Sequence, residues 1–269
     1  MKKRRNPSSK ELVFIKLGGA AITFKDKKNE VNFKILEQAS KEIAELSKDY
    51  RIIIGHGSGS FGHPTAKKYG VQKGLDFCGS EGYVETRKSA NALNNIVVEH
   101  LISAGVPAVP VQTSACTLLE AGKIKEMCYK PLQMQAESDL VPVIYGDVVF
   151  DLEKGCSIAS TEMILRYLAE KLSPKRIIIG TDVDGVYTKD PKQEGSELIK
   201  EINESNKDEI LEKVSGASTT DVTGGMTHKV EELYSIAEKG AEIRIINILK
   251  KNNLKKAVQG EEIGTLIKK

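Results

Sequence analysis

The sequence predicts an α/β fold in which a parallel sheet is covered by helices on both faces. Short apolar runs alternate with amphipathic segments, which is the pattern of such a sheet. Two β-branched runs, residues 51–54 and 176–179, end directly in glycine, and loops at the carboxyl ends of parallel strands are where these sheets hold ligands. The length of 269 residues allows one large domain with a substantial core.

The predicted strands are short apolar runs bounded by glycine, proline or charged residues. In chain order they cover residues 12–17, 51–54, 106–111, 141–145, 148–152, 176–180, 242–246 and 264–267. Two prolines make the strand at 106–111 irregular or place it at a sheet edge, because proline cannot donate to a ladder. Residues 116–127 predict a small β-hairpin.

The predicted helices are segments whose apolar residues recur every three or four positions. They cover residues 31–48, 82–104, 132–137, 161–172, a weakly patterned 201–214, and a segment opened by Gly224-Gly225 that runs to Lys239. Ser160 or Thr161 caps the helix at 161–172, with Glu162 in its first turn. Residues 64–80 are rich in glycine and lysine, and we expect them to be irregular.

Residues 51–63, RIIIGHGSGSFGH, form the stretch around which the chain is organised. A buried strand leads into four glycines interleaved with serines and histidines. Glycines let backbone N–H groups approach phosphate oxygens without a Cβ in the way. Pro64 suits the first turn of a helix whose amino end would add its dipole. The stretch therefore predicts an anion-binding loop.

The same loop spells G-x-G-x-x-G, which is also the dinucleotide-binding pattern. That motif normally opens the first βα unit and is followed about 20 positions later by an acidic residue at a strand end. Here a strand and a helix precede the loop, and Asp76 does not end a predicted strand. We therefore favour a phosphate-binding loop and keep dinucleotide binding as an alternative.

Three glycine turns lie beside cationic side chains, a pattern that suits phosphoryl transfer. The turns are Gly18-Gly19, residues 55–62 and Gly224-Gly225, and the neighbouring cations are Lys16, Lys25, His63 and Lys229. Phosphoryl transfer depends on positioning and on neutralising charge over oxygens, which backbone N–H groups and lysines provide. The chain lacks the Walker A spacing and the protein-kinase motifs.

Bulk properties exclude several other classes of function. The net charge is only +3, from 40 basic and 37 acidic residues, which argues against nucleic acid as a partner. Without an 18-residue apolar run or a signal peptide, we expect no membrane association and a cytoplasmic location. The four cysteines have neither metal-ligand spacing nor a disulfide pattern. Residues 1–10 are expected to be a disordered basic tail.

Five motifs together resemble the amino acid kinase superfamily. They are KLGG from Lys16, HGSGSFGH from His56, YGDV from Tyr145, TDVDGV from Thr181 and DVTGGM from Asp221. The second histidine of the glycine loop, His63, makes the chain similar to those members that phosphorylate isopentenyl phosphate. The resemblance runs from Leu12 to Lys269.

This resemblance implies a three-layer αβα sandwich with a largely parallel central sheet. It implies a single domain over residues 11–269, whose N-terminal half (about 11–155) binds the acceptor and whose C-terminal half (about 156–269) binds ATP. It also implies an alkyl monophosphate as acceptor, a role in isoprenoid precursor synthesis, ATP with Mg²⁺ as cofactors, and a homodimer.

The resemblance assigns roles residue by residue, and it assigns no side chain to a metal. Lys16, Lys25 and His63 are the expected catalytic residues, with Lys25 stabilising transition-state charge and His63 bonding the acceptor's phosphate. The expected acceptor-binding residues are Gly57, Ser58, Gly62, His63, Thr86 and Thr161. The expected ATP-binding residues are Lys16, Gly18, Gly19, Gly59, Asp182, Asp184, Gly225 and Lys229.

Three departures from the superfamily pattern keep two alternatives open. Ala20 replaces a serine, Ser58 replaces a glycine, and Thr161-Glu162 stands where a Gly-Asp pair is usual. Glu162 keeps a carboxylate that can orient Lys16 and Lys229. The alternatives are a kinase for another small acid (carboxylate, phosphonate or carbamate) and a catalytically lapsed nucleotide-binding regulator. His56 is expected to support the loop rather than touch substrate.

Overall fold

An eight-stranded sheet forms the centre of the computed structural model, which describes residues 10–216 and 225–269, with side chains for 10–213 and 230–269. All neighbouring strands run parallel except β13 and β14. The strand order is β12 (Glu201–Ile202), β14 (Thr265–Ile267), β13 (Glu242–Asn247), β9 (Arg176–Thr181), β1 (Leu12–Leu17), β2 (Arg51–His56), β6 (Val141–Tyr145) and β3 (Ala108–Pro110). The predicted parallel sheet is confirmed, and β3 is an edge strand as its prolines indicated.

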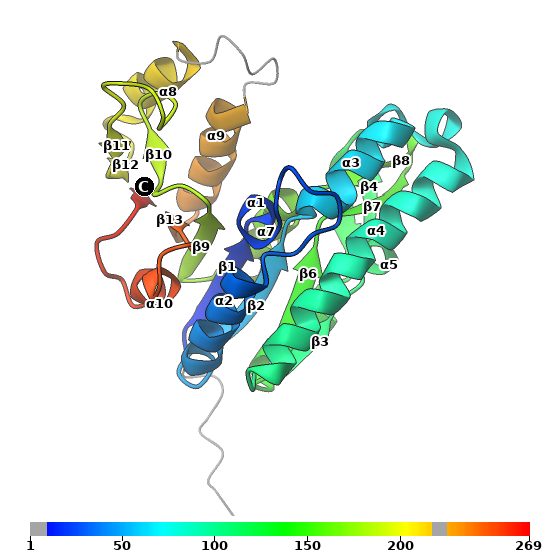
Figure 1. The fold of residues 1–269 in the computed structure, drawn as a ribbon, viewed down its shortest axis with the longest axis horizontal. Coiled ribbons are helices and arrows are strands. Elements are labelled where there is room, and N and C mark those ends of the chain that lie inside the picture. The colour runs from blue at the N-terminus through cyan, green and yellow to red at the C-terminus, as the bar shows by residue number, and fades with distance from the viewer. Residues whose placement is uncertain (1–9, 217–224) are drawn as a thin grey trace, which may run out of the picture.

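Helices cover both faces of this sheet, which confirms the three-layer αβα architecture (Figure 1). One layer contains α2 (Phe33–Leu46), α4 (Leu75–Ser103) and α10 (Asn253–Val258), and the other contains α6 (Lys130–Glu137), α7 (Thr161–Leu172) and α9 (Gly225–Ala237). None of the helices in the described part of the chain is both long and apolar enough to cross a membrane.

Alternation along β1 decides which layer each of its side chains meets. Val13, Ile15 and Leu17 pack in the core under α2 and α4, whereas Phe14 packs in the core under α7 and α9. Lys16 follows the same alternation as Phe14, so its side chain leaves the sheet on the α7 side. The alternation along β1 therefore directs Lys16, its only charged side chain, toward the amino end of α7.

A second, four-stranded sheet lies beside α4 and carries one wall of the site (Figure 1). Its strands in spatial order are β5 (Lys123–Met127), β4 (Thr117–Glu120), β7 (Asp147–Asp151) and β8 (Gly155–Ala159). The antiparallel pair β4–β5 is the predicted hairpin. We did not predict β8, because Gly-Cys-Ser-Ile-Ala has little strand pattern. The remaining strands, β10 (Val186–Tyr187) and β11 (Leu198–Ile199), form a two-stranded antiparallel ribbon.

The expectation that residues 64–80 are irregular was wrong, because this segment is largely helical. It contains most of α3 (Gly59–Tyr69), a 3₁₀ turn (Val71–Lys73) and the start of α4. Gly70 and Gly74 adopt positive φ values of 64° and 99° and separate these helices. Gly79, at φ 63°, interrupts α4 in the same way. The glycines mark junctions between helices rather than an unstructured stretch.

Pro64 does not lie in the first turn of its helix, because α3 already begins at Gly59. Proline has no N–H, so the carbonyl of Ser60 loses its normal partner within the helix. The backbone N–H of Asn29 donates to that carbonyl at 3.3 Å. Because Pro64 leaves the Ser60 carbonyl free, this carbonyl can bond the loop after Lys25 to α3.

The other helices are α1 (Gly19–Ile22), α5 (Thr113–Cys116) and α8 (Lys207–Gly216).

The four cysteines are free thiols. Cys78 and Cys156 are buried with their Sγ atoms 3.6 Å apart, and burial together with the Cys78 contact raises the pKa of Cys156 to about 12. Cys156 is therefore an unreactive thiol in the core.

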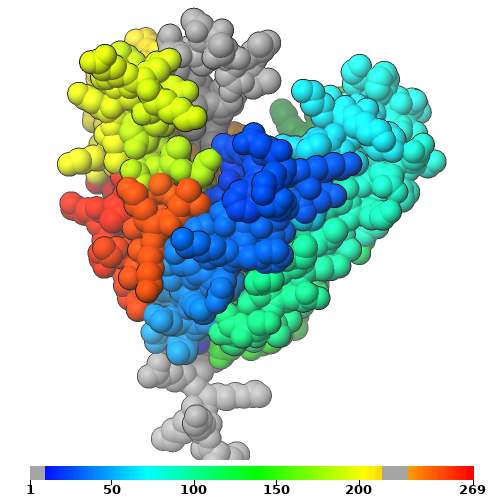
Figure 2. Space-filling view, in the orientation of Figure 1, coloured from blue at the N-terminus to red at the C-terminus, as the bar shows by residue number. Residues whose placement is uncertain are grey.

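The space-filling view shows how the parts of the chain are arranged on one face. In Figure 2 the blue N-terminal segment lies between the yellow-green part of the chain and the cyan residues of α3 and α4.

Candidate active site

A cavity of about 720 Å³ lies at the carboxyl ends of β1, β2 and β9. Residues directly after each of these strands line it, including Gly18, Gly57 and Asp182. The carboxyl ends of adjacent parallel strands meet at one edge of a sheet, so these loops converge without any long-range adjustment. The wall beyond β2 comes from α3, α4, β7 and β8.

Two of the glycine turns pack against each other backbone to backbone. A Cβ on Gly19 would collide with the amide of Gly59, and Gly59 itself has φ 47°. The N–H of Gly18 donates to the carbonyl of Gly180 at 2.9 Å, and a Cβ on Gly18 would overlap that carbonyl. Gly19 and Gly59 are the first residues of α1 and α3, and first-turn N–H groups have no partner within their own helix. The packing therefore gathers two helix amino ends at one anion-binding point.

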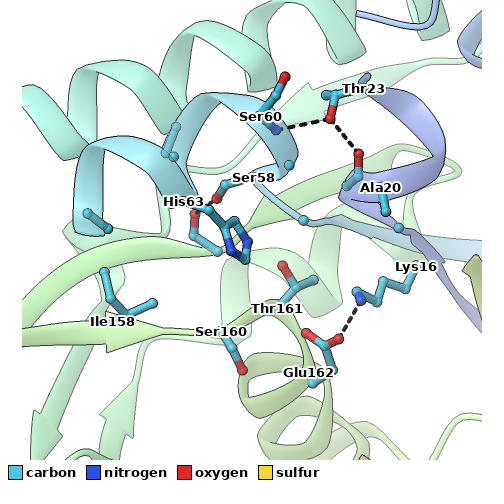
Figure 3. A pocket seen from close by; sticks show the side chains of 18 of the residues that line it. Lys16, Ala20, Thr23, Ser58, Ser60, His63, Ile158, Ser160, Thr161 and Glu162 are labelled. Carbon is cyan, nitrogen blue, oxygen red and sulfur yellow. Dashed lines mark hydrogen bonds and ion pairs between the residues drawn. The ribbon is translucent and has the colours of Figure 1, made fainter. Parts of the chain in front are cut away.

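Thr23 fastens these two turns together (Figure 3). Its hydroxyl donates to the carbonyl of Gly19 at 2.7 Å and accepts from the N–H of Ser60 at 3.0 Å. Thr23 is buried, so water does not compete for these bonds. The geometry of the glycine turns is thus set before any ligand arrives.

The hydroxyls of Ser58 and Thr161 are used within the protein. Ser58 Oγ donates to the carbonyl of Gly146 at 3.1 Å, and Thr161 Oγ1 donates to the carbonyl of His56 at 2.7 Å. Both residues line the cavity. Their side chains hold the loop after β2 against α7 and β7, which leaves the backbone N–H groups as the polar surface that this loop offers.

Lys16 and Glu162 form an ion pair inside the cavity (Figure 3). Glu162 lies in the first turn of α7, whose N-cap Ser160 accepts a hydrogen bond from Met163 N–H at 3.1 Å. A carboxylate in a first turn is favoured by the helix dipole. Lys16 is 6% exposed and Glu162 is half-buried, so screening by solvent is weak here. The expected contact between Glu162 and Lys16 is present.

A second ion pair lies in the wall of the cavity. Lys25 Nζ lies 2.8 Å from Asp182 Oδ2, and both residues line the cavity. Lys25 belongs to the loop after α1, whereas Asp182 follows β9. Because both side chains are partly exposed, the pair contributes little to folding stability. Its significance is that it holds a cation at the edge of the site.

The two histidines of the glycine loop have different surroundings. His63 on α3 is exposed and points into the cavity above Thr161 (Figure 3). His56 is fully buried, with Nε2 3.0 Å from Asn94 Oδ1 and Nδ1 3.2 Å from the carbonyl of Gly57. Burial lowers the pKa of His56, so its imidazole is neutral. His56 supports the loop, as expected, and His63 faces the ligand space.

Most of the remaining predicted residues whose side chains the structure describes line the cavity. Gly57, Gly62 and Thr86 are in its wall. Asp184 is not, because its carboxylate pairs with Lys250 at 2.7 Å and accepts from Asn247 at 3.1 Å, which lowers its pKa. Gly225 begins α9 and Lys229 follows in that helix, but the predictions for their side chains, and for Gly224, fall outside the described residues.

The structure adds lining residues that we did not predict. They include Ala66 and Lys67 on α3, Ala90 on α4, Asp147 and Val148 on β7, and Ile158 on β8. Asp147 directly follows the Tyr145-Gly146 turn between two predicted strands, and this position could have indicated that it lines the site. Lys67 was signalled by its spacing of four residues from His63. Ile158 had no signal, since β8 itself has almost no strand pattern.

Asp147 is a buried carboxylate in the wall of the cavity. Its Oδ1 accepts from the N–H of Val148 at 2.8 Å, and Arg87 Nε lies 4.0 Å from its Oδ2. Burial raises the pKa of Asp147 from 3.8 to about 6, against the opposing effects of Ser114, Val148 N–H and Arg87. The folded protein therefore binds this proton more tightly than the unfolded chain does.

This pKa predicts how Asp147→Asn changes stability with pH. The folded-state pKa is the higher one, so the stability that Asp147 contributes when protonated is lost as pH rises from about 4 to about 6. The asparagine side chain of the variant cannot ionise. We therefore expect the unfolding free energy of the variant, relative to wild type, to rise by about 2 kcal/mol from pH 4.5 to pH 8. Urea unfolding at both pH values measures this, with the exposed Asp26→Asn as control. A difference independent of pH would contradict it.

Within the described residues, no group of three or more His, Cys, Asp or Glu side chains is arranged to hold a metal ion. The two carboxylates that face the phosphate-binding turns, those of Glu162 and Asp182, are each paired with a lysine. A divalent cation at this site would therefore take most of its ligands from phosphates and water.

Comparison with known proteins agrees with this geometry. The sequence profile of the amino acid kinase family matches residues 11–247. The chain is 38% identical to isopentenyl phosphate kinase of Methanothermobacter thermautotrophicus, over 95% of this chain and 98% of that protein. It is 34% identical to the enzyme of the same name from Methanocaldococcus jannaschii, with the same coverage. A solved structure, described as isopentenyl phosphate kinase, superposes with a TM-score of 0.82 at 34% identity, over 95% of this chain and 100% of that one.

Proposed function

This chain belongs to the amino acid kinase family, and we propose that it transfers the γ-phosphoryl group of ATP to isopentenyl phosphate, giving isopentenyl diphosphate and ADP. The relatives named above are supporting observations for the acceptor. The observation that carries the proposal is the convergence of His63, the paired glycine turns and Lys16 on one cavity. That cavity has a cationic end for phosphates and, in Ala66, Val148 and Ile158, an apolar wall for an alkyl chain.

The proposed reaction is an in-line displacement at the γ-phosphorus. An alkyl monophosphate has a second pKa of about 6, so its attacking oxygen is already anionic at neutral pH. The bond from that oxygen to phosphorus forms as the bond to the ADP oxygen breaks, and ADP leaves with the electron pair. No proton needs to be removed, so His63 positions the acceptor's phosphate and is not a general base.

Lys16 and Lys25 are the proposed charge-stabilising groups. Phosphoryl transfer spreads negative charge over the γ-phosphoryl oxygens, and cations placed beside those oxygens stabilise it. Glu162 keeps Lys16 extended from β1 into the cavity. Lys25 is proposed to leave Asp182 and join the phosphates when ATP arrives, because a polyphosphate offers more negative charge than one carboxylate.

The nucleotide is proposed to occupy the β9 side of the cavity. Asp182 follows β9, and Gly225 begins α9, whose amino end suits an ATP phosphate. Lys229 in the same helix and Asp184 after β9 remain predictions for this subsite. Mg²⁺ is expected with ATP, held chiefly by phosphate oxygens and water. By family resemblance we also propose a cytoplasmic homodimer with acceptor and ATP on the N- and C-terminal halves.

A coupled ADP-release assay across acceptors tests the proposed function. We expect kcat/KM for isopentenyl phosphate to exceed the values for phosphonates, carbamate and acidic amino acids by at least about a hundredfold, because those acceptors lack a phosphate dianion, an alkyl chain, or both. Dimethylallyl phosphate, with the same charge and carbon number, is expected to lie within about tenfold. ADP release with none of these acceptors would indicate a lapsed regulator. Preference for a carboxylate or carbamate would place the chain with kinases of other small acids.

A further inference from the structure

The lysines that line the cavity differ in whether a carboxylate is bonded to them. Lys16 pairs with Glu162 and Lys25 pairs with Asp182, so two of the cavity's lysines already have a carboxylate. Lys67 also lines the cavity and is exposed, and within the described residues it has no carboxylate partner. Its charge is therefore available to a ligand.

The position of Lys67 on α3 brings it to the same face as His63. Residues four apart on a helix are neighbours, with Cβ atoms about 5–6 Å apart. Side chains on a helix lean toward its amino end, so Lys67 leans back toward the turn that carries His63. That turn leads directly to Gly59, where the amino ends of α1 and α3 meet. Lys67, His63 and Gly59 are thus spaced four residues apart on α3, and all three line the cavity.

We propose that Lys67 is a second phosphate-binding residue for the acceptor, acting beside His63 on the acceptor's own phosphate. This rests on the proposed function and extends it. An alkyl monophosphate carries a charge of about −1.5 to −2 at neutral pH, which one histidine cannot balance. Lys67 lines the same cavity from the same helix and supplies a full positive charge with three donors. It makes the acceptor site selective for a dianion over a singly charged acid.

A structural role for Lys67 predicts a different outcome. The residue lies in the last turn of α3, where a lysine also complements the helix dipole. Lys68 shares that turn but does not line the cavity; its Nζ lies 4.5 Å from the centre of the Tyr69 ring. Removing either lysine has the same effect on the dipole, whereas only Lys67 faces the ligand space. Lys68 is therefore the matched control.

Steady-state kinetics of Lys67→Met and Lys68→Met test the proposal. We expect Lys67→Met to raise KM for isopentenyl phosphate about tenfold, the scale of one charge-assisted hydrogen bond. KM for ATP and the melting temperature are expected to stay unchanged, and Lys67→Arg to recover most of the acceptor affinity. Lys68→Met is expected to match wild type. A KM within about twofold of wild type for Lys67→Met, or an equal rise for Lys68→Met, would overturn the assignment.

Calorimetric binding of isopentenyl phosphate separates this inference from the proposed function. If wild type fails to turn over this acceptor but binds it, and Lys67→Met weakens binding about tenfold, the assignment of Lys67 survives without the activity. If wild type turns over the acceptor and Lys67→Met binds it equally well, the activity stands and the assignment of Lys67 is wrong. If wild type does not bind it, both are wrong.

Discussion

Replacing Lys16 by methionine is expected to lower kcat by about a thousandfold, the largest effect of any single substitution in this chain. The variant removes a buried cation from the phosphate-binding point. It also removes the cation that lies between the carboxylate of Glu162 and the bound phosphates, so less of the repulsion between these anions is offset. Methionine has similar length and apolar character, so the core around β1 is preserved.

Glu162→Asp is the matched control for this prediction. It keeps the charge and shortens the side chain by one methylene, and it restores the acidic residue that the family resemblance leads us to expect. We expect kcat within about tenfold of wild type, because Lys16 keeps a carboxylate partner. Single-turnover assays with the folded state checked by circular dichroism measure both variants. A Lys16→Met enzyme that retains a tenth of wild-type kcat would rule out Lys16 as a phosphoryl-stabilising residue.

The second large effect is expected for His63→Ala, at about a hundredfold loss in kcat/KM for isopentenyl phosphate. The imidazole faces the cavity and fixes the acceptor's phosphate, so its loss weakens both binding and alignment. KM for ATP should stay the same, because the nucleotide is proposed to lie across β1 from α3.

His100→Ala provides a control of the same chemistry outside the site. His100 lies near the end of α4, stacks on Phe33 at 5.3 Å between ring centres, and does not line the cavity. We expect its kcat/KM to match wild type. If His63→Ala retains near-normal kcat/KM for the acceptor, the role of His63 is disproved, and with it the main sequence argument for a phosphate acceptor.

The parts of the fold that could be predicted are those recorded in local sequence. Buried parallel strands such as β1, β2 and β9 are continuous β-branched or apolar runs, so their existence and order were readable. Lys16 stood out as the one charge in such a run. The sequence indicated a cap for α7 at Ser160 or Thr161, and in the structure Ser160 is the cap.

The features that could not be predicted depend on contacts between distant segments. Nothing local to Lys25 identifies Asp182, 157 residues away, as its partner. Pro64 was misplaced because the Asn29 N–H that accommodates it inside α3 comes from another loop. The cavity wall formed by β8 was missed for a related reason, since a strand with a weak pattern is stabilised by its neighbour β7 rather than by its own sequence.

The central position of β1 has a consequence for redesign. β1 lies between β2 and β9 in the sheet (Figure 1). On the proposed function, the segments that recognise the acceptor therefore lie on one side of β1 and those that bind ATP lie on the other. On that proposal, exchanging wall residues such as Val148 or Ile158 is expected to alter the acceptor side alone. On the proposed function, the protein is thus a modular scaffold in which acceptor choice can be re-engineered at these wall residues while the segments assigned to ATP keep their sequence.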